Sequence, residues 1–521
     1  MLVARHVPAL TEAQFAAVAT ACDRLLRAPG TSLARIAIPI LHVINEHPGC
    51  LEPYRPLAAA WETGLADGAA VPAPRYEPLR SVARVGRGLL RSVSPARRTD
   101  RIIGLAACIG PVDVLIVSRL LNRRQLLAED DFYFGPLQRL LAERGAGSVV
   151  AYINHLADRD PVDEVPGSRV VLPRTAPPGV EAGIWSRCLT TRRQLNAAAQ
   201  TAQSQVERSV AALASRHAMF EHTAINLRLH AAVARLCRYL KPRIVITTYE
   251  GDSSERLIWQ AAREGGNRPL CVGYQHTRLL ARAHAIRRLV AAPGVECDPD
   301  VILTLGSQSH EALASSAGLG STRLVEYGSH RRAVGFDGPP PDLRPRCCLV
   351  LPDGDEREFF TLFHFAAECA RADPTVGFIV RPHPIVDAER LRQRLELPGN
   401  LTLSVGTALM DDLTRARYCI YRGSSAVVHA VIAGLKPFYV HQHGELNFDP
   451  LFALSGWRET ITSPEEFGIR LQEAERAAGS DGRIAAEAAR RFCEDYVSPL
   501  RPAALDELLS MALRASTDST G

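Results

Sequence analysis

The sequence predicts an α/β protein with two Rossmann-like domains that face a cleft, preceded by a mainly helical extension. From about residue 100, short β-branched runs alternate with amphipathic helical stretches, which is typical of parallel α/β layers. A proline-rich segment, 329–346, divides these runs into two sets. Within the 521 residues we therefore expect a helical region over 1–100, a first Rossmann-like (acceptor) domain over 101–330 and a second (nucleotide-donor) domain over 331–515.

In the extension, residues 11–28 carry apolar side chains at helical spacing, and Thr11 with Gln14 forms a capping box. A helix is expected there. The first sheet is predicted from strands at 113–118, 148–155, 243–249, 270–274, 301–306 and 324–328, with helices over 134–145, 188–240 and 253–264. The second is predicted from strands at 347–352, 376–382, 401–405, 418–421 and 437–440, with helices over 356–371, 387–396, 408–416 and 425–433.

The composition excludes several classes of protein. With 46% apolar and 22% charged residues, the chain is neither disordered nor fibrous. A net charge of +5 without a basic reading module predicts no nucleic-acid partner. Scattered cysteines without C-x-x-C indicate thiols in a reducing compartment. Because no signal peptide or uninterrupted apolar span is visible, we expect a cytoplasmic protein.

Four polar motifs each come directly after a predicted strand. In parallel sheets, the carboxyl ends of the strands meet at one edge, and ligands bind in the crevice there. The motifs are Tyr249-Glu250-Gly251-Asp252, Gly273-Tyr274-Gln275-His276-Thr277, Arg381-Pro382-His383-Pro384 and Arg422-Gly423-Ser424-Ser425.

The first two motifs carry groups that can accept a proton. Glu250 could deprotonate a hydroxyl nucleophile, or it could, with Asp252, simply favour the positive end of the following helix. His276 could be a base, an acid or a phosphate ligand, or a hydrogen-bonded structural residue.

The other two motifs suit an anion. Two prolines stiffen the loop that carries His383, and Arg381 adds a permanent cation, although a proline-rich turn with a solvated histidine would look the same. After Arg422, Gly423 permits close backbone approach, and the hydroxyls of Ser424 and Ser425 with the following helix could hold phosphate. An ordinary serine N-cap is the alternative.

Other patterns say less. The triplet Asp353/Asp355 is expected by chance, and a surface loop explains His441-Gln442-His443 as well as a metal site does, so no metal is predicted. No P-loop, complete G-x-G-x-x-G or G-x-S-x-G is present, which argues against kinases, dehydrogenases and serine hydrolases. The arginines of segment 79–93 fall on one helical face, which is either a membrane-surface patch or a solvated face.

Together the motifs resemble those of the GT-B glycosyltransferases of bacterial surface polysaccharide assembly, the group of CMP-sialic acid and CMP-Kdo transferases, over roughly residues 101–500. Bacterial sialyltransferases of that fold carry an acidic-acidic-Gly motif, an HP motif and a paired-Ser motif. Here Tyr249-Glu250-Gly251, His383-Pro384 and Ser424-Ser425 occur in that order. Tyr249 takes the place of the first acid, so only Glu250 is carried over as the base.

The resemblance implies a metal-independent transferase that needs no cofactor and moves a sugar from a nucleotide-activated, CMP-linked donor to a glycan or lipid-linked saccharide of capsule or O-antigen biosynthesis. Glu250 would deprotonate the acceptor, with His276 as its partner or substitute. His383 and Arg381 would stabilise the departing phosphate, and Arg422-Gly423-Ser424-Ser425 would hold it. Peripheral contact with the inner face of the plasma membrane is part of the same expectation.

Three alternatives remain open. Gln275-His276 and Lys436-Pro437 resemble segments of the CDP-glycerol polyolphosphate transferases, whose product is a phosphodiester. A sugar-nucleotide epimerase of the same fold, or a noncatalytic nucleotide-binding protein, would use the same cleft. DVLIVS, DDFYFG (130–135), YEGDSSERLIW and GYQHT also resemble a less characterised family of surface carbohydrate and O-antigen biosynthesis proteins.

Overall fold

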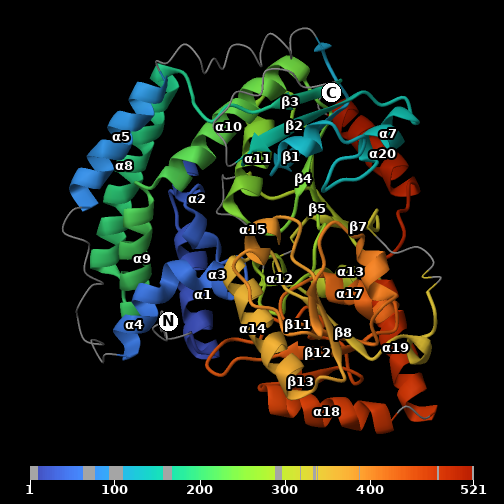
Figure 1. Ribbon diagram of the computed structural model, residues 1–521. Coiled ribbons are helices and arrows are strands. Elements are labelled where there is room, and N and C mark those ends of the chain that lie inside the picture. Colours follow the sequence, from blue (N-terminus) through green and yellow to red (C-terminus); the bar gives the residue numbers. More distant parts are fainter. Residues whose placement is uncertain are drawn as a thin grey trace.

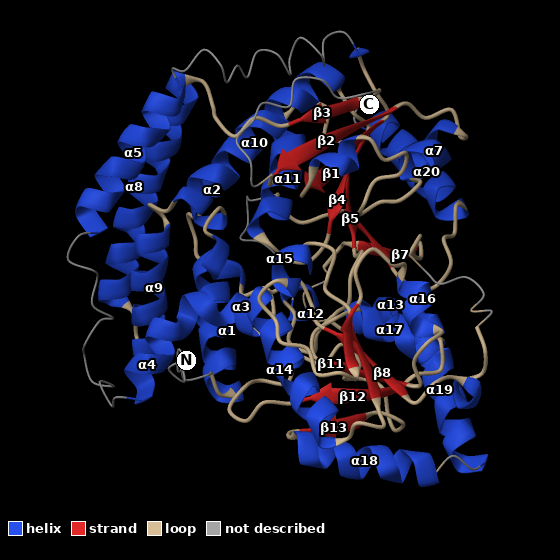
Figure 2. Cartoon of the chain, in the orientation of Figure 1, coloured by secondary structure: helices blue, strands red, loops and turns tan. Residues whose placement is uncertain are grey.

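The computed structural model describes residues 10–62, 77–92, 109–156, 167–287, 296–331 without 317 and 319, 336, 338–386, 388–477 and 480–518. Within these residues the chain forms two wholly parallel β-sheets, and its N-terminal part is helical (Figures 1 and 2). The predicted architecture, two Rossmann-like α/β domains with an N-terminal helical region, is confirmed.

The first sheet has seven strands in the order β3-β2-β1-β4-β5-β6-β7, so the chain starts in the middle and winds outward both ways. Its central strands are buried on both faces, which is why their sequences read as continuous apolar runs. The strands are β1 (Val114–Leu120), β2 (Ser148–Asn154), β3 (Arg169–Val171), β4 (Ile244–Thr248), β5 (Leu270–Tyr274), β6 (Val301–Thr304) and β7 (Arg323–Glu326).

The helices of the first domain connect these strands, and α11 reproduces the predicted helix 253–264. The predicted 188–240 helical stretch forms α8, α9 and α10, with α8 starting earlier, at Pro178. The helices are α7 (Leu137–Ala142), α8 (Pro178–Thr201), α9 (Gln205–His217), α10 (Glu221–Leu240), α11 (Ser253–Glu264), α12 (His284–Arg287) and α13 (Ser307–Ala314), with a 3₁₀ turn, η4 (Arg123–Leu126).

The second sheet has six strands in the order β10-β9-β8-β11-β12-β13, the same outward winding. Its strands are β8 (Cys347–Leu351), β9 (Gly377–Val380), β10 (Leu401–Leu403), β11 (Tyr418–Tyr421), β12 (Lys436–Val440) and β13 (Glu459–Ile461). Its helices are α14 (Glu356–Ala372), α15 (Ala388–Arg392), α16 (Leu409–Leu413), α17 (Ala426–Ile432) and α18 (Pro464–Arg476), after the 3₁₀ turn η5 (Pro341–Leu343).

The N-terminal helices pack beside the first domain, where α1 contacts α9 (Figure 1). The predicted capping box of α1 is present: the Thr11 hydroxyl accepts the N–H of Gln14, whose side chain accepts the N–H of Thr11. The region comprises α1 (Glu12–Arg27), α2 (Leu33–Ile36), η1 (Pro39–His42), α3 (Pro48–Leu51), η2 (Glu52–Tyr54), α4 (Arg55–Glu62) and α5 (Glu77–Ser92).

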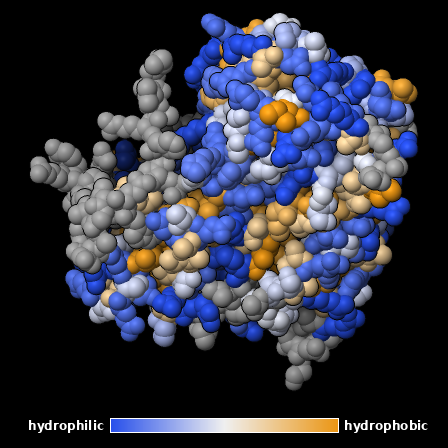
Figure 3. Space-filling view, turned by 90° about the horizontal axis from the view of Figure 1, so that it is seen from below, coloured by the Kyte–Doolittle hydropathy of each residue, from blue (hydrophilic) through white to orange (hydrophobic). Residues whose placement is uncertain are grey.

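Residues 79–92 of the arginine-bearing segment 79–93 belong to helix α5, which packs on α8, and residue 93 lies outside the described residues. The Arg84 guanidinium lies 4.6 Å from the centroid of the Phe220 ring, so one of its arginines covers an aromatic side chain. None of the described helices has the length and apolarity that a membrane crossing needs. Polar side chains cover much of the face in Figure 3, with apolar ones between them.

The C-terminal helices connect the two domains. Helix α19 (Ser480–Tyr496) contacts both α17 and α13, and α20 (Ala503–Asp518) packs against the first domain, where Arg144 pairs with Asp506 at 2.7 Å (Figure 1). The returning chain touches the outgoing one: the N–H of Ser329 donates to the carbonyl of Ser498 at 2.9 Å. The two connections between the domains therefore lie side by side.

We expect Gly328→Ala to lower the free energy of unfolding by about 3 kcal/mol, because Gly328 has a φ of +87° and a Cβ there would stand 2.1 Å from the carbonyl oxygen of Pro499. Gly145→Ala is the matched control, since Gly145 has a φ of +70° but open space around it. Its expected cost is about 1 kcal/mol. Urea unfolding measures both, and equal costs would show that the two connections do not depend on their close contact.

Candidate functional site

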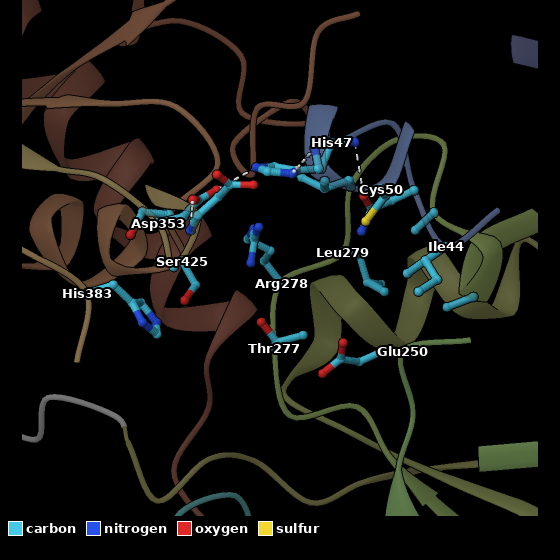
Figure 4. A pocket seen from close by; sticks show the side chains of 18 of the residues that line it. Ile44, His47, Cys50, Glu250, Thr277, Arg278, Leu279, Asp353, His383 and Ser425 are labelled. Atoms are coloured by element: carbon cyan, nitrogen blue, oxygen red, sulfur yellow. Dashed lines mark hydrogen bonds and ion pairs between the residues drawn. The ribbon is translucent and has the colours of Figure 1, made fainter. Parts of the chain in front are cut away.

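A cavity of about 480 Å³ lies between the two domains, at the carboxyl edges of both sheets (Figure 4). The N-terminal region supplies one wall, which includes His47. The first domain contributes Glu250 and Arg278, and the second contributes Asp353 and His383. Three parts of the chain that are far apart in sequence therefore build one site.

The loop between β4 and α11 directs Glu250 toward this cavity. Asp252 caps α11, and the buried carboxylate of Glu255 reaches back to the loop. It accepts the backbone N–H of Glu250 at 2.9 Å and of Gly251 at 2.8 Å, and the hydroxyl of Thr248 at 2.8 Å. Gly251 has a φ of +91°, which a glycine adopts without strain. Because the backbone donors all face Glu255, the loop is held in one conformation.

Glu250 and His276 form a pair at the wall of the cavity, with Oε1 of Glu250 3.2 Å from Nε2 of His276. Burial raises the pKa of Glu250, an effect that the charge of Arg119 opposes and that of Asp252 strengthens. Burial also lowers the pKa of His276 well below its usual value. His276 is therefore neutral near pH 7, and a carboxylate with a raised pKa beside it is suited to accept a proton.

Arg278 is the cation of the cavity. Among the residues that the structure describes, no carboxylate lies within ion-pair distance of it, and Figure 4 shows its guanidinium in the middle of the labelled side chains. Sequence reasoning missed this residue. Its one signal is position: it follows His276 by two residues in the polar segment at the end of β5.

His383 enters the cavity from the loop after β9, and its ring is oriented by the backbone. Its Nδ1 accepts the N–H of Ile385 at 3.3 Å, so Nε2 carries the proton. Burial lowers the pKa of His383, with the charge of Asp353 opposing. Ser424 and Ser425 line the same side, and the Ser425 side chain makes no capping hydrogen bond to α17, which leaves its hydroxyl for a ligand.

His47 bridges the N-terminal region and the second domain. Its Nδ1 accepts the N–H of Gly49 at 3.1 Å, so Nε2 carries the proton and donates it to Oδ2 of Asp353 at 2.6 Å (Figure 4). Burial alone would raise the pKa of Asp353, but His47 holds it below its usual range. Because both ring nitrogens of His47 are engaged in hydrogen bonds, His47 has none left for a ligand, and its role is to position Asp353. The Asp353/Asp355 triplet, ascribed to chance in the sequence, lies in the cavity wall.

Three predicted anion ligands lie outside the lining of this cavity. Arg381 pairs with Asp412 at 2.6 Å. The buried guanidinium of Arg422 pairs with Glu358 at 2.7 Å and with Glu445. Gly423 lies under Asp353, where a Cβ would stand 2.9 Å from the carboxylate. Arg422 and Gly423 thus support the wall, while Glu250, His383, Ser424 and Ser425 face the cavity and His276 backs Glu250.

Within the described part of the chain, no three His, Cys, Asp or Glu side chains converge as metal ligands would. That the protein works without a metal stays a prediction.

Comparisons with known proteins find no matching protein-family model and no matching curated protein. Among solved structures, the calicheamicin glycosyltransferase CalG4 is 16% identical, with 78% of this chain and 98% of that chain covered and a TM-score of 0.44. The glycosyltransferase SnogD from Streptomyces nogalater is 17% identical, with 77% of this chain and 99% of that chain covered and a TM-score of 0.40. The wall teichoic acid polymerase TagF is 10% identical, with 86% of this chain and 100% of that chain covered and a TM-score of 0.39. Similarity at this level fixes no activity, and the fold rests on the two sheets themselves.

We expect Glu255→Gln to lower the free energy of unfolding by about 1–3 kcal/mol, because an amide nitrogen cannot accept the N–H groups that the carboxylate binds. Glu143→Gln is the control, since Glu143 is exposed and its one ion pair among the described residues is with Arg139, one turn away; its cost should stay below about 0.5 kcal/mol. Equal unfolding free energies in urea would show that Glu255 does not hold the loop.

Proposed function

We propose that this protein is a glycosyltransferase that moves a sugar from a nucleotide-activated donor to a hydroxyl group of a saccharide acceptor. One observation carries the proposal: one cavity is lined by a base candidate, Glu250, and by two groups for an anion, Arg278 of the same domain and His383 of the other. His276 backs Glu250. Transfer from a sugar nucleotide needs both, because a proton leaves the acceptor while negative charge develops on the departing phosphate.

In the proposed step, the Glu250 carboxylate takes the proton of the acceptor hydroxyl. The acceptor oxygen forms a bond to the anomeric carbon as the bond from that carbon to the phosphate oxygen breaks. The nucleotide leaves with the electron pair of that bond, and the proton stays on Glu250. Nε2 of His276 lies 3.2 Å from Oε1 of Glu250, and this contact would orient the carboxylate.

The leaving phosphate would lie against Arg278, His383 and the hydroxyl of Ser425. The neutral His383 ring donates a hydrogen bond from Nε2, because its lowered pKa keeps it uncharged at neutral pH. Arg278 supplies the positive charge. Without a carboxylate partner in the described residues, its guanidinium can bind phosphate through two N–H groups.

The finer assignment concerns donor, acceptor and location. We propose a CMP-linked nonulosonate or Kdo as the donor and a surface polysaccharide or lipid-linked glycan as the acceptor, on the strength of the Glu250-Gly251, His383-Pro384 and Ser424-Ser425 motifs. Transfer would need no metal, because Arg278 would offset the phosphate charge and His383 would donate a hydrogen bond to it. Contact with the inner face of the plasma membrane belongs to the same proposal, since lipid-linked acceptors are held there.

We expect Glu250→Gln to lower kcat by about 10²–10⁴-fold with little change in nucleotide affinity, because the amide cannot accept a proton. In the wild type, kcat/KM should fall as the pH drops through the pKa of Glu250, which burial sets above the ordinary 4.5. The carboxylate must be ionised to act, so activity is present above that pKa and lost below it.

Release of nucleotide from each donor sugar, with and without acceptor, measures this effect. Glu143→Gln serves again as the control. Unchanged turnover in Glu250→Gln would eliminate Glu250 as the base, and nucleotide binding without any turnover in the wild type would favour a noncatalytic protein.

We expect Arg278→Gln to weaken nucleotide binding by about 10–100-fold, because it removes the cation that faces the phosphate. Arg381→Gln should leave nucleotide affinity unchanged and instead destabilise the fold, since it removes the cation that contacts the buried Asp412 at 2.6 Å. Thermal shift with CMP, CDP, UDP and GDP and their sugars measures both effects, because a ligand of the folded state raises its apparent stability.

Selective stabilisation by CMP would support the nonulosonate or Kdo donor, whereas preference for UDP or GDP would remove it. Stabilisation by CDP-glycerol with phosphodiester product would assign the polyolphosphate reaction instead. If Arg381→Gln loses nucleotide binding and Arg278→Gln keeps it, the assignment of the phosphate site to Arg278 is wrong.

A further inference from the structure

A tight turn at residues 131–135, directly beside the site, is fixed by one carboxylate. Oδ1 of Asp131 accepts the hydroxyl of Ser118 at 3.0 Å and the backbone N–H groups of Tyr133 at 2.8 Å and Phe134 at 2.9 Å. The backbones of Asp131 and Gly135 bond to each other in both directions, at 3.1 and 2.8 Å. The turn therefore presents its two partly buried aromatic rings, Phe132 and Tyr133, in a set position.

These rings reach the proposed base pair. The Tyr133 ring meets the ring of His276 edge to face, with centroids 4.9 Å apart, and His276 in turn pairs with Glu250. The Phe132 ring meets Tyr133 in the same way at 5.1 Å. Neither aromatic residue lines the cavity with Arg278, so the turn forms a separate surface, which reaches that cavity through His276 and Glu250.

A cation lies on this aromatic surface. The guanidinium carbon of Arg331 is 4.4 Å from the centroid of the Phe132 ring and 5.9 Å from that of Tyr133. One of its N–H groups donates to the carbonyl of Phe132, and its backbone N–H donates to the hydroxyl of Ser329 at 3.1 Å. Arg331 is exposed, and in the described residues no carboxylate lies within ion-pair distance of it.

Aromatic rings beside a cation suit one kind of ligand. Ring faces and edges cover the apolar C–H surface of a sugar, and a guanidinium binds carboxylate or phosphate through two parallel N–H groups. We propose that Phe132, Tyr133 and Arg331 form a subsite for an anionic saccharide, one that carries a carboxylate or a phosphate. This inference rests on the proposed function for its role: the saccharide bound beside Glu250 is the acceptor.

The test compares three small sugars by ligand-observed NMR titration of the full chain: methyl glucuronide, glucose 6-phosphate and methyl glucoside. We expect at least one anionic sugar to bind about tenfold more tightly than the neutral one. Preference for methyl glucuronide would show that the natural ligand carries a carboxylate, and preference for glucose 6-phosphate would show that it carries a phosphate.

The variant Arg331→Gln should abolish the preference for anionic sugars. Arg323→Gln, which removes an exposed arginine paired with Glu507, should keep it. Equal or absent binding of the three sugars overturns the subsite, as does a preference that survives Arg331→Gln.

Phe132→Leu separates the ring from the charge. It keeps an apolar side chain in the turn but removes the ring, so binding of neutral and anionic sugars should weaken together by about tenfold. Unchanged binding would contradict the aromatic part of the subsite.

The nucleotide measurements keep the two proposals apart. Nucleotide binding without a preference for anionic sugars overturns this inference and leaves the proposed function. Anionic sugar binding without nucleotide binding supports the subsite and overturns the transferase.

Discussion

The carboxylate of Glu255 is the group on which the geometry of the site depends. It lies inside the first turn of α11 and binds the backbone of the preceding loop, so the N–H groups of Glu250 and Gly251 point inward. The Glu250 side chain is then turned toward the cavity, where burial raises its pKa and His276 can reach it. A helix cap thus places the reactive group, and the position of Glu250 follows from the local sequence, whereas His276 is brought to it by the fold.

The remaining walls come from tertiary structure. His47 belongs to the N-terminal region, yet it fixes Asp353 of the second domain, and Gly423 leaves room for that carboxylate. The cavity is complete only when the N-terminal region and both domains are assembled. This explains why His47 lies in the cavity wall although both of its ring nitrogens are already hydrogen-bonded: its role there is to hold Asp353.

Local signals could be predicted from the sequence, and pairings between distant residues could not. The capping box of Thr11 and the buried strands follow from residue type and spacing, whereas the three-residue edge strands β3 and β13 were not predicted. The edge strand β10 is as short, but it begins the run LTLSV (401–405), which was recognised. Glu250 and His383 were predicted because they end apolar runs. Arg381 also ends an apolar run, but its charge is already neutralised by Asp412. Asp412 lies 31 residues further along the chain, so the sequence does not reveal this pairing. Arg278 was missed because only the fold shows that it has no such partner among the described residues.

The paired connections between the domains limit how the cleft can change shape. The outgoing chain at Ser329 is bonded to the returning chain at Ser498, so any opening must turn about this two-stranded joint, which resists twisting more than a single linker would. The same joint lies next to Tyr496, whose hydroxyl accepts the N–H of Leu279 in the cavity wall. Rotation of the second domain would therefore pull directly on the segment that carries Arg278, and the width of the cleft and the position of its cation would change as one movement.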